Sequence, residues 1–150
     1  MIGIVSDTIM KMRVVLDSSV LVAGFRSRRG ASFHVLGLLR AGRFEIAISV
    51  PLVLEYEAVV RRHANELGFR GHEVVELVDY LCRIGHRQDI HFLWRPVLRD
   101  PTDEFVLELA VAAECRAIVT HNVRDFSNAR MFGVEILTPA AFIRRVEEVP

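Results

Sequence analysis

One stretch, residues 13–20, limits the fold of this chain more than any other feature: it is a short apolar run that ends on a carboxylate followed by two hydroxyls. An apolar run without alternation predicts a strand buried on both faces, and such strands belong to parallel sheets covered by helices. Ligands bind beyond the carboxyl ends of the strands in open α/β sheets, so Asp17 would lie at the mouth of a site. Asp17, Ser18 and Ser19 are also good N-cap residues for the helix predicted over 18–25, and capping is the alternative role of the acid.

The remaining sequence alternates further strands with helices, which is the pattern of a mainly parallel sheet covered on both faces. Strands are predicted over 44–48, 90–94, 116–120 and 134–137. Helices are predicted over 31–41, 51–62, 73–84, 103–115 and 140–148, and the polar segment 65–72 is predicted to be a loop. At 150 residues the chain suits one domain, here 13–150, with residues 1–12 as an N-terminal extension or loose tail.

Composition narrows the class of protein. The 19 basic and 19 acidic residues leave no net charge, so no overall field attracts nucleic acid or an anionic membrane, although local patches remain. No apolar stretch approaches the roughly 20 residues that span a bilayer, and the N-terminus lacks a signal-peptide pattern. Cys82 and Cys115 lie in apolar helical segments outside any C-x-x-C pair, which favours a reduced protein in the cytoplasm.

Four acidic side chains are expected at the same edge of the sheet. Asp17 ends the first strand, Asp125 follows a later buried strand, and Asp103 opens a helix. Glu55 lies beside the apolar stripe of the helix over 51–62, as its spacing from the apolar residues shows. A buried carboxylate must be paired, hydrogen-bonded or bound to a metal, because burying it bare is too costly.

The expected grouping of these four acids predicts a binding site for a divalent cation. Four carboxylates brought together repel one another, and a cation removes that repulsion. Oxygen ligands without Cys or His favour Mg²⁺ or Mn²⁺ over Zn²⁺, and these ions activate water and stabilise charge on a phosphodiester. Each acid also has an ordinary alternative role: Asp17 and Asp103 could cap or charge a first helical turn, Glu55 could pair with an arginine, and Asp125 could be a turn residue.

Four segments of the chain together resemble PIN-domain nucleases, in particular the bacterial VapC-like toxin components of toxin–antitoxin systems. Each segment carries one of the acids, and the segments are 15–21, 51–56, 100–107 and 118–126. The resemblance implies a PIN-like three-layer α/β/α sandwich with a mainly parallel central sheet. It also implies a ribonuclease that uses Mg²⁺ or Mn²⁺ to cleave single-stranded RNA. Its catalytic and metal-binding residues would be Asp17, Glu55, Asp103 and Asp125.

The resemblance further implies two partners, a cognate antitoxin protein and a second copy of the chain in a homodimer. The stripe of Phe33, Leu36 and Leu39 is expected in the core, and any exposed part of it could seat an antitoxin helix or the second copy. One position departs from the family: many members carry Thr-Gly-Asp after the later strand, where this chain has Asn122. An amide lowers the charge available for a second metal, so we expect one metal site.

Several polar side chains near the acids are candidate contacts for the substrate. They are Ser19, Asn122, His121, Arg26, Arg28, Arg29 and Arg124. The loop over 26–30 is the most basic in the chain, and its guanidinium groups could contact phosphate or simply be solvated. His121 is a titratable donor beside the acids, with a solvated loop histidine as the alternative.

A different class of function is a catalytically weak PIN-fold module that binds RNA or a protein partner, with Asn122 as a mark of lost activity. A receiver-like phosphate-handling domain is disfavoured because Lys11 is the only lysine of the chain. The absence of a G-x-x-x-x-G-K-[ST] motif argues against hydrolysis of nucleoside triphosphates.

Overall fold

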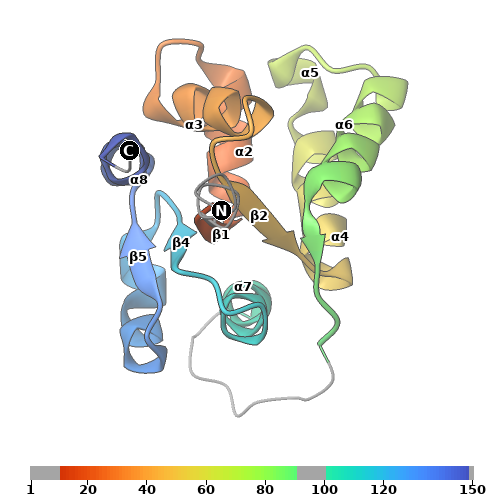
Figure 1. The fold of residues 1–150 in the computed structure, drawn as a ribbon. Helices are drawn as coiled ribbons and strands as arrows, with labels where there is room; N and C mark the ends of the chain where they lie inside the picture. The colour runs from red at the N-terminus through yellow and green to blue at the C-terminus, as the bar shows by residue number, and fades with distance from the viewer. Residues whose placement is uncertain (1–10, 91–100, 149–150) are drawn as a thin grey trace, which may run out of the picture.

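A five-stranded parallel sheet forms the centre of the computed structural model, which describes residues 11–90 and 101–148. The strands are β1 (Arg13–Leu16), β2 (Glu45–Ile48), β3 (His86–Arg87), β4 (Ala117–Val119) and β5 (Glu135–Leu137). Their order across the sheet is β3-β2-β1-β4-β5, and every neighbouring pair is parallel (Figure 1). The predicted parallel sheet is therefore confirmed, with β1 at its centre.

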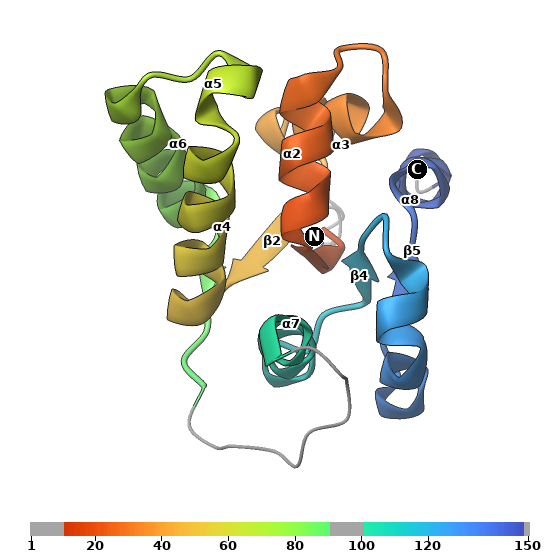
Figure 2. The same cartoon turned by 180° about the vertical axis from the view of Figure 1, so that it is seen from behind.

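Helices cover both faces of this sheet, as expected for an α/β/α sandwich. They are α2 (Ser18–Arg26), α3 (Ala31–Arg40), α4 (Val50–Arg62), α5 (Ala64–Leu67), α6 (Gly71–Ile84), α7 (Pro101–Ala112), the 3₁₀ helix η1 (Val123–Phe132) and α8 (Pro139–Glu147). Figure 1 shows α7 and η1 on one side of the sheet and α2, α3, α6 and α8 on the other. Seen from behind in Figure 2, α4 lies alongside α2.

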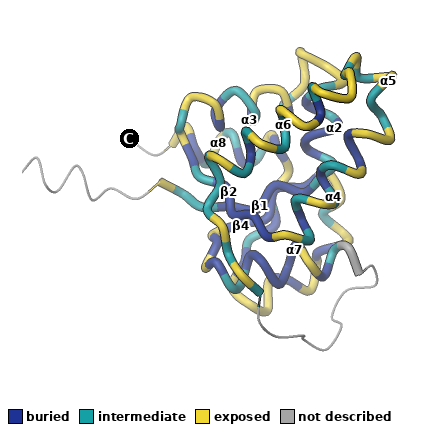
Figure 3. The backbone as a smooth tube through the Cα atoms, turned by 90° about the vertical axis from the view of Figure 1, so that its right-hand side faces the viewer, coloured by how far each residue is buried: buried dark blue, intermediate teal, exposed yellow. Residues whose placement is uncertain are grey.

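Burial on both faces of the strands explains their uninterrupted apolar sequence. Val14 and Val15 of β1 are fully buried, and so are Ile46 of β2 and Ile118 of β4. Figure 3 shows these strands as the buried interior beneath partly exposed helices. An alternating sequence would have placed polar groups against one of the helical layers, where they would lack water.

Local signals set several helix ends where the sequence predicts them. The Ser49 hydroxyl accepts a hydrogen bond from the backbone N–H of Leu52 (3.4 Å), and Pro51 occupies the first turn of α4. Thr138 caps α8 in the same way (3.2 Å to the N–H of Ala141). Gly42 follows α3 with a φ of 74°, the left-handed conformation that commonly ends a helix.

Two local features differ from the prediction. The segment 65–72 is a loop only over residues 68–70: α5 ends at Leu67, Gly68 follows it with a φ of 79°, and α6 already begins at Gly71. The Glu73 carboxylate accepts a hydrogen bond from the backbone N–H of Arg70 (2.9 Å) and so stabilises the start of α6. After β4, residues 120–122 form a short loop, and the 3₁₀ helix η1 that begins at Val123 is an element that the sequence pattern did not predict.

The strand predicted over 90–94 falls largely outside the described residues, and Ile90 itself is not in a strand. The edge strand β3 pairs instead at His86 and Arg87 with Ala47 and Ile48. Two polar residues carry no periodicity, so the sequence pattern gave no sign of this strand. Most of the predicted extension 1–12 also lies outside the described residues.

Cys82 and Cys115 are free thiols, and burial raises the pKa of Cys115 to about 12. Among the described helices, none combines the length and apolar character needed to cross a membrane.

Candidate active site

The strand order reverses beside β1, and this topology creates a crevice. From β1 the chain proceeds to β2 and β3 on one side, whereas β4 and β5 lie on the other. Crevices at such a switch point, at the carboxyl ends of the strands, are the usual ligand sites of open parallel sheets. The backbone N–H of Asp17 donates to the carbonyl of Val119 (2.9 Å), which fixes the end of β1 against the end of β4.

A cleft of about 690 Å³ opens at this position. Four acidic side chains from four separate segments line it: Asp17, Glu55, Asp103 and Asp125. The hydroxyls of Ser18 and Ser19, the imidazole of His121 and the amide of Asn122 line it as well. The sequence-predicted acids therefore share one cleft, although they are as far apart in the chain as residues 17 and 125.

Asp17 is the most buried of the four acids, with only 6% of its surface exposed. One of its oxygens, Oδ2, accepts hydrogen bonds from the hydroxyls of Thr120 (2.7 Å) and Ser19 (2.8 Å). Asp17 occupies the N-cap position of α2, yet its side chain makes no capping hydrogen bond. The carboxylate is thus held by two hydroxyls of the site, and the capping alternative does not describe it.

Thr120 is a site residue that the sequence analysis missed. It is completely buried directly after β4, and its hydroxyl also accepts a hydrogen bond from the backbone N–H of Asn122 (2.9 Å). Ser19 makes a parallel link, because its hydroxyl accepts from the backbone N–H of His121 (3.3 Å). Both hydroxyls therefore tie Asp17 to the loop after β4. A hydroxyl residue between an apolar strand and a polar loop was the available signal.

A buried tyrosine positions Glu55. The Tyr56 hydroxyl donates to the carbonyl of Leu16, the residue just before Asp17, and so fixes α4 to the end of β1. Burial raises the pKa of the Tyr56 phenol above its usual value, and the nearby charge of Asp17 adds to the rise. Glu55 is half-buried on the cleft side of α4, and its Oε2 accepts from the Ser18 hydroxyl (3.4 Å).

The other two acids come from first helical turns on the opposite side of the sheet. Asp103 lies in the first turn of α7, where it is half-buried. Asp125 lies in the first turn of η1 and is exposed, and its backbone N–H donates to the carbonyl of Asn122 (3.0 Å). A carboxylate at a helix N-terminus is favoured by the helix dipole, so this position also helps two like charges face one cleft.

The donor set suits a hard divalent cation. Carboxylate, hydroxyl and amide oxygens converge on the cleft, and thiol ligands are absent from its lining, which matches Mg²⁺ or Mn²⁺. Within the ranges that the structure describes, no three His, Cys, Asp or Glu side chains stand close enough together to hold a metal as they are. Unscreened carboxylates repel one another, so side-chain rotation would have to accompany binding of an ion.

Basic side chains line the cleft away from the strand ends. Arg26, at the end of α2, is one of them, and Arg62 and His63 were not predicted. Two other predicted contacts, Arg28 and Arg29, line a separate hollow against α8. The lining of the acidic cleft also does not include Arg124, which is exposed on η1.

His121 is not a simply solvated histidine. Its Nε2 lies 2.6 Å from the hydroxyl of Ser32, a buried residue in the first turn of α3. This contact fixes the imidazole at the border of the cleft and satisfies a hydroxyl that would otherwise be buried without a partner.

Comparison with known proteins agrees with this geometry. A family model of the PIN domain matches residues 13–124. One similar solved structure is that of VapBC2 from Rickettsia felis bound to a promoter DNA fragment. Its matched chain is 16% identical in sequence to this one with a TM-score of 0.57, and the match covers 85% of this chain and 98% of that chain. VapBC-1 from nontypeable Haemophilus influenzae is 13% identical with a TM-score of 0.54, over 86% and 99% of the two chains. At these identities the likeness shows a common fold. The search of curated proteins found no match.

Proposed function

This chain belongs to the PIN domain family, and from that premise we propose that it is a metal-dependent endoribonuclease that acts as the toxin of a toxin–antitoxin pair. One observation carries the proposal. Asp17, Glu55, Asp103 and Asp125 come from four distant segments and line a single cleft at the switch point of a parallel sheet. A purely structural role for the acids gives no reason for four carboxylates to face the same solvent-filled space.

Asp17, Asp103, Glu55 and Asp125 would hold the cation. When bound, Mg²⁺ or Mn²⁺ would supply an activated water and neutralise charge on the phosphodiester. The chain's own contribution is orientation, because Thr120 and Ser19 hold the Asp17 carboxylate in one position. Asn122 offers an amide where many family members have an acid, and we therefore propose one metal site.

Single-stranded RNA is the proposed substrate. The chain has no net charge, so attraction of a polyanion must come from the local cations Arg26 and Arg62 on the same cleft, beside the imidazole of His63. The cleft is open on the surface beyond the carboxyl ends of the β-strands, where an extended RNA chain has access to the acids. The imidazole of His121 and the amide of Asn122 line the cleft beside Asp17 and can contact phosphate or ribose oxygens, whereas the Ser19 hydroxyl already donates to Asp17.

An antitoxin is the proposed protein partner, as the similar solved structures are VapBC assemblies. A groove of about 420 Å³ between α3 and α6 has the character of a docking site for an apolar helix. Phe33 is 40% exposed at this groove and Leu36 lines it, whereas Leu39 lies beneath them in the buried core. The lining of this groove carries two acidic side chains, Glu73 and Glu76, and one basic side chain, Arg40, so basic residues are favoured on the part of the partner that faces α6.

The proposed antitoxin groove has a direct test. The chain is co-expressed with the product of an adjacent short reading frame, and the two are co-purified. Phe33→Asp should prevent co-purification, because it puts a charge into the groove. Val50→Asp, at a residue that is 72% exposed elsewhere on the surface, should leave the complex intact. Equal recovery of the complex with both variants would refute this groove as the antitoxin site.

We propose a homodimer as the state of the free chain, and light scattering of the purified protein measures its mass.

The nuclease is tested by incubating single-stranded RNA with the protein in the presence and absence of Mn²⁺. Wild type should cleave only with the ion, and Asp17→Asn should abolish cleavage. Glu57→Gln is the matched control, because Glu57 lies on α4 near Glu55, pairs with Arg61 and does not line the cleft. If no RNA is cleaved while Asp17→Asn retains partner binding, the catalytically weak binding module is the correct function.

A further inference from the structure

The acidic cleft has a second, basic end formed by two neighbouring helices. On α2, Val22 and Arg26 follow Ser18 at intervals of four residues, so all three lie on one face of the helix. On α4, Arg62 lies seven residues after Glu55 and therefore on the same face, about 10 Å farther along the helix axis. Figure 2 shows α2 and α4 side by side. Each helix therefore carries a site residue near the strand ends and an arginine near its own C-terminus.

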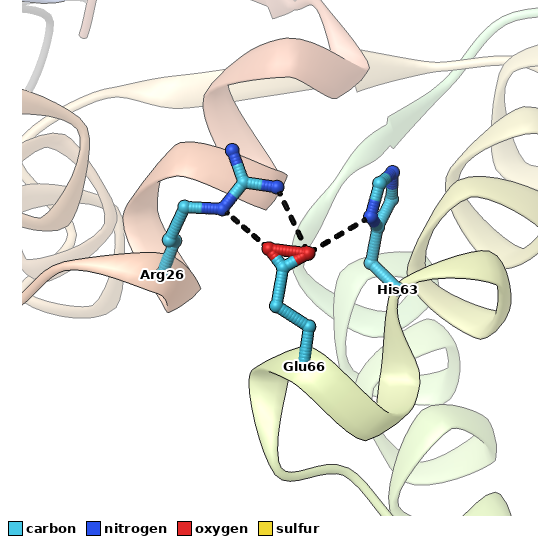
Figure 4. A network of polar contacts seen from close by, with 3 residues as sticks. All are labelled: Arg26, His63 and Glu66. Atoms are coloured by element: carbon cyan, nitrogen blue, oxygen red, sulfur yellow. Dashed lines mark hydrogen bonds and ion pairs between the residues drawn. The ribbon is translucent and has the colours of Figure 1, made fainter.

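A carboxylate already occupies part of this basic end. Glu66 of α5 accepts a forked contact from Arg26, with 2.8 Å from Nε and 3.3 Å from Nη2 (Figure 4). The same carboxylate lies 3.3 Å from Nδ1 of His63, on the turn between α4 and α5. The hydrogen bond from Arg26 is the largest cause of a lowered pKa of Glu66, and the contact with His63 also lowers it. Glu66 is therefore held as an anion by two cleft residues.

The chemistry of this contact is that of phosphate recognition. A guanidinium fork binds carboxylate and phosphate oxygens with the same two parallel hydrogen bonds. About half of each side chain is exposed, 50% for Arg26 and 47% for Glu66, so solvent screens the pair and it contributes little to stability. An incoming phosphate can exchange with Glu66 at low cost.

The residues between the two ends are apolar. Val22, Ala23 and Val59 line the cleft between the acids and the basic end, and Val22 and Val59 are largely buried. They place no competing charge between the two ends, so a ribose or base can lie across them while phosphates contact polar groups at either end.

We propose that Arg26, Arg62 and His63 form a subsite for a backbone phosphate that flanks the one at the acids, and that Glu66 fills this subsite in the free protein. The proposal rests on the function proposed above, because it assigns the path that the RNA strand follows through the same cleft. The strand then runs from the acids along α2 and α4 towards α5. Glu66 keeps the Arg26 side chain extended over the cleft until the phosphate replaces it.

The test measures binding of a fluorescent single-stranded RNA in EDTA, which prevents cleavage, over a series of salt concentrations. Arg26→Ala and Arg62→Ala should each weaken binding about tenfold and reduce the salt slope by about 0.7, the value for one lost phosphate contact on a single strand. Glu66→Gln should tighten binding several-fold, because the competing charge is removed. Arg26→Lys keeps the charge without the fork and should bind with intermediate affinity.

Matched controls come from an ion pair of the same kind outside the cleft. Arg61 pairs with Glu57 (3.0 Å) one turn apart on α4, next to Arg62 in sequence, and neither residue lines the cleft. Arg61→Ala and Glu57→Gln should leave affinity and salt slope unchanged. Equal affinities for Arg26→Ala, Arg62→Ala and Arg61→Ala would overturn the subsite, and so would weaker binding by Glu66→Gln.

Cleavage of the same RNA with Mn²⁺ by wild type, measured alongside, separates the two proposals. Cleavage together with unchanged affinity of the arginine variants refutes the subsite and leaves the nuclease standing. Absence of cleavage together with the predicted losses of affinity refutes the nuclease and supports the subsite as part of an RNA-binding surface. Circular dichroism melting of each variant confirms that a lost affinity does not come from unfolding.

Discussion

Replacing Thr120 with valine removes one hydroxyl from the centre of the site and keeps the size of the side chain. Thr120 is completely buried, and its hydroxyl donates to Asp17 (2.7 Å) and accepts from the N–H of Asn122 (2.9 Å). A hydrogen bond to an ionised group contributes about 1.5–3 kcal/mol and a neutral one about 0.5–1.5 kcal/mol. Asn122 is exposed, so water replaces much of the second bond. We expect Thr120→Val to lower the free energy of unfolding by about 2–3 kcal/mol.

The same substitution should lower activity more than it lowers folding. Asp17 keeps the hydrogen bond from the Ser19 hydroxyl, and loss of a partner that orients a metal ligand typically costs about 10–100-fold in metal affinity or activity. Thr120→Ser is the matched control, because it keeps both hydrogen bonds and loses one buried methyl, about 1 kcal/mol. Urea denaturation gives the stabilities and RNA cleavage with Mn²⁺ gives the rates. Equal cleavage by folded Thr120→Val and Thr120→Ser would refute the positioning role of this hydroxyl.

Two further substitutions test the surroundings of the site. Tyr56→Phe removes the buried hydrogen bond to the carbonyl of Leu16 and should lower the free energy of unfolding by about 1–2 kcal/mol in urea denaturation, so an unchanged midpoint would contradict its role in fixing α4. Glu108→Gln concerns a carboxylate whose pKa is raised by burial and then by the charge of Glu104 one turn away. Below the pKa that Glu108 has in the unfolded chain, its carboxyl is protonated in both the folded and the unfolded protein. At higher pH the carboxyl ionises freely only in the unfolded protein, so wild type loses stability. The melting temperature of the variant should therefore be a few degrees above that of wild type at pH 8 and equal to it at pH 4. A difference in melting temperature that is largest at pH 4 would contradict this pH dependence.

The sheet and the meeting of the acids were predictable because both follow from features of single segments. An unbroken apolar strand must be covered on both faces, and an acid directly after such a strand must lie at its carboxyl end. Asp17 meets both conditions in its own few residues. Glu55 was predictable from helical periodicity alone, since its position relative to the apolar stripe decides which way it faces.

The missed features depend on contacts between segments. His63 reaches the cleft because the chain turns there from α4 into the short helix α5, most of which lies in the segment that was predicted to be a loop. Arg28 and Arg29 differ from Arg26 by two and three positions, yet they lie beyond the end of α2 and face α8. Thr120 carries no charge to draw attention in the sequence, and its role appears only when β4 is placed beside β1.

Anomalous diffraction from crystals of the full chain soaked with Mn²⁺ tests most directly whether these acids share one cation. One Mn²⁺ is expected in the cleft, coordinated by Asp17 and at least two of Glu55, Asp103 and Asp125 after rotation of their side chains. The same soak with Asp17→Asn should show no ion at this position. An ion bound away from these carboxylates in wild type, or an equally occupied site in Asp17→Asn, would contradict a shared metal site.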